Sequence, residues 1–458
     1  MHDMTVTPDV NSLYINDLDL LNDLIKKAVR AGADAADALL ISGQSMTVAC
    51  RNGSVEALER ADGYDVGLRV LVGQRQAVVS SSDASLKALD ELVDRAVAMA
   101  RQVPEDPFVG LADPAELARD MPCLDVFDPS QASADDLIFL SREAEDAARA
   151  VPGITNSEGA EASWGTSRVA LVASNGFAHS YQASGSSLSV SIVAGQASEV
   201  MERDYECSSA VWRSDLAAPS DLGRRAGQRA VRRLGARRIK TCTVPVIFEP
   251  RVARGLLASF CSAINGVSVA RGTSFLKDSL ESSVFQSGVT IFEDPHRARG
   301  LKSRPIDVEG LPAVKRALVQ DGTVTTWIMD LGTARQLGLK STGHAVRGVS
   351  GPPSPSVSNV WMEKGSLSFD EMVQDVGTGL LVTDVFGQGV NLVTGDYSRG
   401  CSGFWIENGE LTYPVNEITI AGNLKDMFRN LTPATDLEIM YGTDSPSVRV
   451  DGMTIAGA

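Results

Sequence analysis

Histidine content limits the metal chemistry available to this chain. Hydrolysis by a zinc enzyme requires closely spaced side-chain ligands and a general base, as in His-Glu-x-x-His on one face of a helix. The 458 residues include four histidines, no two of which lie within helical reach of one another; they are His2, His179, His296 and His344. We therefore expect no zinc site formed by this chain alone.

Nucleophilic catalysis by a cysteine is a second chemistry to consider. Cys401 lies in the glycine-rich segment GDYSRGCSGFW, and His344 lies in KSTGHAVRG. A thiolate and an imidazole from these segments would form a catalytic pair if the fold brought them together. We favour the structural alternative, in which Cys401 is a small apolar residue in a tight turn and His344 is a hydrogen-bonded loop residue.

The other charged residues form no recognisable catalytic motif. No GxxxxGK[ST] sequence is present, and no GxGxxG joins a strand to a helix. The run RRAGQRAVRRLGARRIK (224–240) is strongly basic, and we expect it to pair with acidic groups of the chain itself rather than with a ligand. Carboxylates are numerous, but nothing in the sequence places two together; they include Glu309, Asp330, Asp375, Asp384 and Asp396.

Composition excludes several classes of protein. With 42 basic and 58 acidic residues the net charge is −16, which repels polyanions, so we expect no direct contact with nucleic acid. Six scattered cysteines indicate neither a disulfide framework nor a CxxC metal site, and are typical of a reducing compartment. The sequence shows no secretory signal and no apolar run of about 18 residues, so we expect a cytoplasmic protein without membrane contact.

Hydrophobic periodicity predicts two similar N-terminal units. In residues 1–115 we expect helices at about 17–31 and 84–102, with short strands in 45–58 and 64–81 that turn at Asn52-Gly53. Residues 116–240 begin with a helix over about 134–149 and repeat the strand pattern. Gly53 and Gly176 are 123 residues apart and Gly73 and Gly195 are 122 apart, which indicates a duplication.

The remaining residues, 241–458, have a different pattern. A helix is expected over 251–264 (RVARGLLASFCSAI), followed by short strands and hairpin turns such as Asp321-Gly322 and Asn408-Gly409. The predicted fold class is therefore α+β, with duplicated N-terminal α/β sub-domains followed by a large β-rich C-terminal domain.

Several long segments resemble the PmbA/TldE branch of the TldD/PmbA proteins, a family also called modulators of DNA gyrase. The longest is GVNLVTGDYSRGCSGFWIENGELTYPVNEITIAGNLKDMF (389–428). Shorter ones occur in the same order along the chain: ASNGFAHSY (173–181), MERDYE (201–206), GTSFL (272–276), LGLKSTGHAVRG (337–348) and GMTIAG (452–457).

The resemblance implies a function in proteolysis. It implies a cytoplasmic bacterial system in which a TldD-type chain and a PmbA/TldE-type chain assemble into one metallopeptidase. That enzyme degrades or trims unfolded peptides and takes part in the maturation of peptide antibiotics. The resemblance also implies that the TldD-type chain holds zinc with His-Glu-x-x-x-His on a helix and a cysteine near its C-terminus.

This chain departs from the catalytic paralogue at the zinc positions. Aligned on VPVIFEP and GTSF, the two histidines of the paralogue fall on Ala258 and Ala263, and its general-base glutamate falls on Ser259. Alanine cannot ligate a metal, and serine cannot replace a carboxylate as the base. The C-terminal segment TDLEIMYGTDSPSVRV contains no cysteine. We therefore expect a non-catalytic subunit that binds no cofactor, with zinc in its TldD-type partner.

Such a subunit would contribute to the peptide-binding chamber. An extended peptide can be held by main-chain hydrogen bonds, so we expect the 389–403 and 341–348 loops to contact it. The candidate substrate-binding residues are His344, Asn391, Asp396 and Ser398, with the alternative that these loops only shape turns.

Two other functions remain open. One is a non-enzymatic protein that binds peptides or modulates a topoisomerase, and the other is an independent peptidase that uses Cys401 and His344. In the absence of a partner, a two-fold homodimer is the default expectation.

Overall fold

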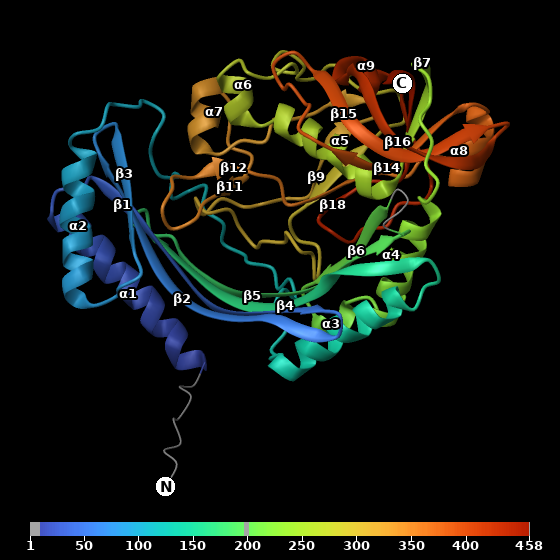
Figure 1. Ribbon diagram of the computed structural model, residues 1–458. Coiled ribbons are helices and arrows are strands. Elements are labelled where there is room, and N and C mark those ends of the chain that lie inside the picture. The colour runs from blue at the N-terminus through green and yellow to red at the C-terminus, as the bar shows by residue number, and fades with distance from the viewer. Residues whose placement is uncertain (1–9, 197–200, 458) are drawn as a thin grey trace, which may run out of the picture.

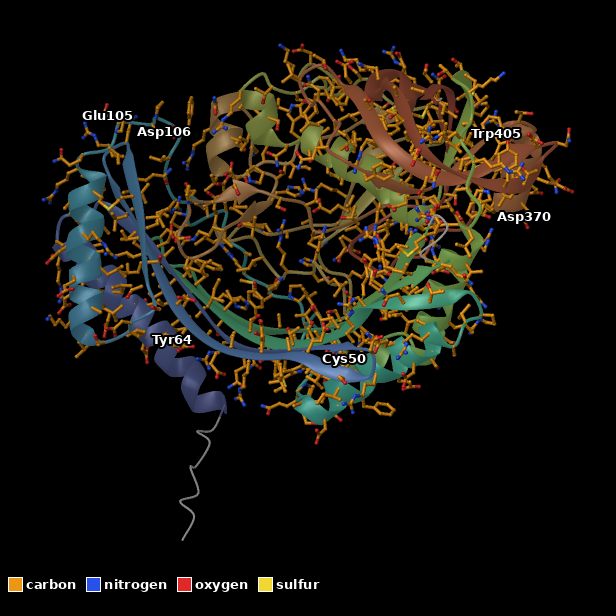
Figure 2. All side chains as sticks on the ribbon, in the orientation of Figure 1. Cys50, Tyr64, Glu105, Asp106, Asp370 and Trp405 are labelled. Carbon is orange, nitrogen blue, oxygen red and sulfur yellow. The ribbon has the colours of Figure 1, made fainter. Side chains whose placement is uncertain are left out.

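The computed structural model describes residues 10–196 and 201–457, with side chains from residue 17 onward. A long, strongly curved sheet forms one half of the molecule, and the C-terminal domain is seated on its concave side (Figure 1). The side chains of both halves fill the space between them (Figure 2). His2 lies outside the described residues.

Two equivalent units build the curved sheet. Each consists of a helix, three antiparallel strands and a second helix. The first unit contains α1 (Val10–Arg30), β1 (Ala35–Arg51), β2 (Ser54–Val72), β3 (Arg75–Ser81) and α2 (Leu86–Ala100). The second contains α3 (Ala134–Arg149), β4 (Ile154–Ala173), β5 (Ala178–Ala194), β6 (Glu202–Ala210) and α4 (Pro219–Arg232), with a short 3-10 turn at Arg213–Asp215. The strand order β3-β2-β1-β4-β5-β6 is symmetric about the β1–β4 pair, so the predicted duplication is confirmed.

The prediction of short strands was wrong. β1 pairs with β2 and β4 with β5 over nearly their whole lengths of 17 to 20 residues. Glycines in the middle of these strands resemble turn signals in the sequence, but Gly43 pairs with Gly63, and Gly165 with Gly185. A Cβ on Gly43 would lie 2.2 Å from the carbonyl oxygen of Thr166 on β4, so close packing of the strands requires glycine there.

The four long helices cover the convex side of the sheet. α1 and α2 lie at one end, and α3 and α4 lie at the other (Figure 1). The helix expected at about 17–31 lies within α1, and the apolar residues on one of its faces are at most 6% exposed: Leu21, Leu24, Ile25 and Ala28. The helix expected at 134–149 is α3, which begins with a capping box made by Ser133 and Asp136.

The C-terminal domain is built on a closed ring of strands. Its main sheet has the order β16-β15-β14-β7-β19-β17, and a further pairing of β16 with β19 closes the ring. These strands are β7 (Cys242–Phe248), β14 (Gly379–Phe386), β15 (Asp396–Glu407), β16 (Glu410–Asn423), β17 (Leu431–Pro433) and β19 (Val448–Ala456). The hairpin turns predicted at Asp321-Gly322 and Asn408-Gly409 are confirmed by positive φ at all four residues.

A second sheet and five helices complete this domain. The sheet has the order β10-β9-β8-β13-β18, with strands β8 (Ile291–Asp294), β9 (Arg316–Gln320), β10 (Thr323–Val324), β13 (Asn359–Met362) and β18 (Thr443–Asp444). A small ribbon pairs β11 (Ala345–Val346) with β12 (Ser354–Pro355). The helices are α5 (Pro250–Ala263), α6 (Gly266–Ala270), α7 (Leu331–Leu337), α8 (Phe369–Val376) and α9 (Leu424–Arg429). The predicted α+β class is confirmed, whereas the boundaries at 115/116 and 240/241 stay predictions.

A buried ionic cluster attaches the C-terminal domain to the sheet. Asp37 on β1 accepts a hydrogen bond from Nε of Arg69 on β2 at 2.6 Å, and its other oxygen lies 2.5 Å from Nη2 of Arg347. The side chains of Arg347 and Asp37 are 0% and 3% exposed. The segment that carries Arg347 lies directly on β2, because a Cβ on Gly67 would lie 2.1 Å from the carbonyl oxygen of Val349.

We expect the substitution Arg347→Met to lower the free energy of unfolding by about 3–5 kcal/mol, because it leaves the Asp37 carboxylate buried with one cation fewer. Urea unfolding followed by tryptophan fluorescence measures the change. The exposed pair of Arg75 and Glu105 provides the control, since Arg75→Met should stay within about 0.5 kcal/mol of the unsubstituted chain. Equal stability of the two variants would show that the buried pair does not hold the domains together.

The same interface contains carboxyl groups that burial makes sensitive to pH. Burial raises the pKa of Glu309, the carboxylates of Asp307 and Asp330 raise it further, and Arg69 only partly offsets them. Because the pKa of Glu309 is raised in the folded state, its contribution to the free energy of unfolding is fully present below the pKa of a glutamate in the unfolded chain, about 4.3. This contribution is lost as the pH rises from that value through the raised pKa of the folded state.

Glu309→Gln tests this dependence, because a glutamine oxygen can still accept the hydrogen bond that the main-chain N–H of Leu331 donates to Glu309 at 2.8 Å. We expect the unsubstituted chain to lose more stability between pH 5 and pH 8 than the variant loses. Thermal unfolding midpoints at the two pH values measure the difference. Parallel pH profiles would contradict a buried, protonated Glu309.

Candidate functional site

Helix α5 carries the residues that the sequence resemblance aligns with the zinc ligands of the catalytic paralogue. Its first residue is Pro250, which suits the first turn because proline lacks an N–H group. Ala258 is exposed, Ala263 is 0% exposed, and the hydroxyl of Ser259 donates to the carbonyl of Gly255 at 2.9 Å. Neither methyl group is a metal donor, so these residues do not fit a zinc ion. Within residues 10–196 and 201–457, no three His, Cys, Asp or Glu side chains converge as metal ligands.

Cys401 and His344 do not form a catalytic pair in this conformation. Cys401 lies on β15 at 0% exposure, and burial raises the pKa of its thiol to about 12. His344 is 2% exposed, with Nε2 2.5 Å from Oε2 of Glu293 and Nδ1 2.8 Å from Oγ1 of Thr342. Burial opposes ionisation of Glu293, but hydrogen bonds from His344 and Ser358 outweigh it and lower the pKa of this carboxyl. The imidazole therefore holds the 341–348 segment in place.

Thiol reactivity provides a direct check. At pH 8 a disulfide reagent should label the exposed Cys123 quickly and should label Cys401 only after unfolding, because a buried, protonated thiol is a poor nucleophile. Mass spectrometry of the labelled peptides identifies the site. Rapid labelling of Cys401 in the folded chain would restore it as a candidate nucleophile.

The other three candidate residues lie together on one exposed loop and the strand that follows it. Oδ1 of Asn391 accepts from the N–H of Val393 at 2.9 Å, and Asp396 accepts from the Thr394 hydroxyl at 2.6 Å. The side chain of Ser398 is exposed, and its main-chain N–H donates to the carbonyl of Gly389 at 2.7 Å. The structure therefore brings Asn391, Asp396 and Ser398 together at the surface, whereas His344 is buried elsewhere.

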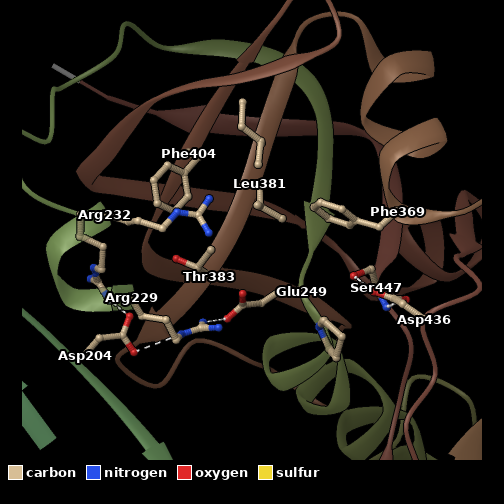
Figure 3. A pocket seen from close by; sticks show the side chains of 13 residues that line it. Asp204, Arg229, Arg232, Glu249, Phe369, Leu381, Thr383, Phe404, Asp436 and Ser447 are labelled. Atoms are coloured by element: carbon tan, nitrogen blue, oxygen red, sulfur yellow. Dashed lines mark hydrogen bonds and ion pairs between the residues drawn. The ribbon is translucent and has the colours of Figure 1, made fainter. Parts of the chain in front are cut away.

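A pocket at the start of α5 was not predicted from the sequence. It has a volume of about 250 Å³ and lies where β6, α4, α5 and the C-terminal ring meet (Figure 3). Apolar side chains form one wall: Pro250, Phe369, Leu381, Phe404 and Leu411. Polar and charged groups form the other: Asp204, Arg229, Arg232, Arg233, Glu249, Thr383, Asp436 and Ser447. These residues are brought together by long-range packing, and their sequence spacing gives no sign of it.

The charged wall of the pocket is largely neutralised from within. Asp204 accepts from Nη1 of Arg251 at 2.7 Å and lies 3.4 Å from Nη1 of Arg233. Burial opposes ionisation of Asp204, but the hydrogen bond and charge of Arg251 outweigh it and lower the pKa of this carboxyl. Glu249 pairs with both Arg229 and Arg251. Within the basic run at 224–240, Arg229 and Arg233 therefore pair with acidic groups of the chain itself, as expected.

Arg232 differs from its neighbours in this network. Its guanidinium lies over the ring of Phe404, 4.9 Å from the ring centroid, and its side chain is exposed at the rim of the pocket. In the part of the chain that the structure describes, no carboxylate forms an ion pair with it. The pocket therefore combines an apolar wall with one cation whose charge is free to meet an anion.

A second cavity of about 370 Å³ extends the pocket along α5. It shares Arg229, Glu249 and Pro250 with the first cavity. It continues past Arg254, whose guanidinium lies over the ring of Tyr441 at 4.6 Å from the centroid. The two cavities together therefore extend along the first turns of α5 as far as Arg254, one helical turn before Ala258.

Comparison with known proteins assigns the chain to a class. It matches the PmbA/TldA metallopeptidase domain 1 over residues 36–100, the central domain over 127–234 and the C-terminal domain over 241–457. Metalloprotease PmbA of Escherichia coli O157:H7 is 40% identical to it over 427 residues, which cover 93% of each chain.

Two crystal structures have the same fold. A protein from Bacteroides thetaiotaomicron VPI-5482 described as a modulator of DNA gyrase is 26% identical, with a TM-score of 0.88 over 97% of this chain and 99% of that one. TldE from Thermococcus kodakarensis is 20% identical, with a TM-score of 0.85 over 96% of this chain and 100% of that one.

The duplicated sheet beneath a closed strand ring is thus the fold of a metallopeptidase class. The chain belongs to the PmbA/TldD family, as its resemblance in sequence predicted. Among the residues that the structure describes, no helix is long and apolar enough to cross a membrane.

Proposed function

We propose that this chain is the non-catalytic PmbA/TldE-type subunit of a two-chain zinc peptidase that degrades or trims unfolded peptides. The proposal is supported chiefly by two features of α5. This helix has Ala258, Ser259 and Ala263 at the aligned zinc positions, yet a pocket with an apolar wall opens at its N-terminus. A subunit that binds peptide without cleaving it needs such a pocket but does not need metal ligands on α5.

The pocket has the chemistry to hold a side chain of an unfolded peptide. Unfolded chains expose apolar side chains, and the wall formed by Leu381, Phe404 and Leu411 offers them a surface away from water. Arg232 at the rim supports binding of a carboxylate on the same peptide. Because the remaining charges are paired among themselves, the pocket does not require a strongly charged side chain at its base.

Main-chain contacts would come from the exposed loop that contains Asn391 and from the start of β15, which carries Asp396 and Ser398. A glycine-rich loop lets an extended peptide approach its backbone closely, and Ser398 presents an exposed hydroxyl. His344 does not contact the peptide in the proposal, since its ring is buried and its two nitrogens are occupied by Glu293 and Thr342.

The proposal assigns the metal to the partner. Zinc would be held by a TldD-type paralogue, this chain would bind no cofactor, and the complex would act in the cytoplasm without direct contact with nucleic acid. The absence of donor atoms at Ala258 and Ala263 supports this division, and the net charge of −16 argues against DNA as a ligand.

A non-enzymatic peptide-binding protein is the second candidate, because the same pocket would serve binding alone. The independent cysteine peptidase is disfavoured by the burial of Cys401 and by the engagement of both nitrogens of His344.

Cleavage of an unstructured peptide by three samples separates these functions: this chain, a TldD-type paralogue, and their mixture. We expect cleavage that needs the mixture and is abolished by a chelator. Cleavage by this chain alone would contradict the proposal, and binding without cleavage in the mixture would favour the second candidate.

A pocket variant then tests where the peptide binds. Leu411→Asp places a charge in the apolar wall and should raise KM by about tenfold in the mixture. Phe139→Asp is the matched control, because Phe139 is 64% exposed on α3 and lies outside the pocket. Equal KM values for both variants would locate the peptide elsewhere.

A further inference from the structure

One edge of the curved sheet is bare over half a strand. β2 pairs with β1 along its whole length, but β3 covers its other side only from Val66 to Val72. Over residues 54–65 no described strand pairs with that side of β2, which lies at the front rim of the sheet (Figure 1). The ten residues from Ser54 to Gly63 are all exposed, so neither face is covered.

The opposite edge of the same sheet is protected. β6 ends the sheet on that side, and the C-terminal domain occupies its free groups. The hydroxyl of Tyr441 donates to the carbonyl of Cys207 at 2.8 Å, and Nη1 of Arg251 donates to the carbonyl of Tyr205 at 3.3 Å. Natural sheets cover or blunt their edges because unpaired N–H and C=O groups recruit other strands.

The bare part of β2 carries charged side chains and one bulge, but it lacks other protective features of an edge strand. Residues 54–65 contain no proline and no lysine, and the exposed side chains include Leu58 at 49% exposure. A β-bulge occurs at Glu56, where the partner of Ala49 is Ala57 and that of Cys50 is Val55. Beyond the bulge the strand is regular, so residues 57–65 present an unbroken row of main-chain groups.

We propose that residues 57–65 pair antiparallel with the same residues of a second copy of this chain, about a two-fold axis through Ala61. In this register Ala61 faces itself, Arg60 faces Asp62 of the other copy, and Leu58 faces the half-buried Tyr64. On this face of the paired strands, two ion pairs between Arg60 and Asp62 lie at the centre, and an apolar pair of Leu58 and Tyr64 lies at each end.

The other face of the paired strands is also compatible. Glu59 faces Gly63, and Ala57 faces Asp65, so no like charges meet. Moving the axis by one residue in either direction places Arg60 opposite Arg60 or Asp62 opposite Asp62. These like-charge contacts disfavour the two neighbouring registers.

The bulge fits this arrangement. In the proposed register Glu56 lies opposite Val66 of the other copy, the residue at which β3 begins to occupy the edge. A bulge bends its strand, so the chain leaves the line of the sheet where it would otherwise meet β3. Two six-stranded sheets would thus join into one across the two-fold axis. This inference does not depend on the proposed function.

Disulfide cross-linking tests the register. With Cys123→Ser as background, Ala61→Cys should form a covalent dimer under mild oxidation, because facing Cα atoms in an antiparallel pair lie about 4.5–5.5 Å apart. Leu58→Cys is the matched control: Leu58 is also exposed, but its two copies would lie six residues apart, or about 20 Å, and should not cross-link. Equal cross-linking of both variants would overturn the register.

Sedimentation velocity tests the interface without oxidation. We expect the unsubstituted chain to be dimeric, Arg60→Asp to weaken the dimer by at least about tenfold in Kd, and the double substitution Arg60→Asp with Asp62→Arg to restore it. Circular dichroism checks that each variant is folded. A monomeric unsubstituted chain, failure of the double variant to restore dimers, or pairing of this edge only with a TldD-type paralogue would overturn the proposal.

Discussion

The carboxylate of Asp37 is shared between two arginines that belong to different halves of the molecule. Arg69 comes from the same sheet and Arg347 from the C-terminal domain, and all three side chains are almost completely shielded from water. A buried charge that loses its partners destabilises the folded state, so this cluster favours the observed position of the C-terminal domain on the sheet. At the other end of the sheet, Asp204 joins Arg251 of α5 to Arg233, the residue that follows α4, in the same manner.

These two attachments place α5 and its pocket. The helix begins beside Glu249, which pairs with Arg251 and Arg229, so the ion pairs that fix the domain also form one wall of the cavity. The pocket lies at the N-terminal end of the helix whose residues Ala258 and Ala263 align with the paralogue's zinc ligands and offer no donor atoms. A pocket beside a helix that lacks metal donors is the physical basis for proposing a partner subunit.

Local sequence patterns predicted local structure well. The helix at 134–149, the duplication marked by Gly53 and Gly176, and the turns at Asp321-Gly322 and Asn408-Gly409 depend on spacing or backbone preference, which neighbouring residues decide. The sequence did not predict the lengths of β1 and β2, because their central glycines resemble turn signals. These glycines are instead required by close packing of the strands. The pocket and the burial of the 341–348 segment depend on contacts between residues more than a hundred positions apart, about which spacing is silent.

Metal analysis tests the partner-subunit proposal most directly. This chain and its complex with a TldD-type paralogue would each be purified by gel filtration in the presence of zinc, and bound zinc would be measured by mass spectrometry. We expect no stoichiometric zinc on this chain alone and one zinc per pair in the complex, lost when the histidines of the paralogue's His-Glu-x-x-x-His motif are substituted. Stoichiometric zinc on this chain alone would contradict a non-catalytic role.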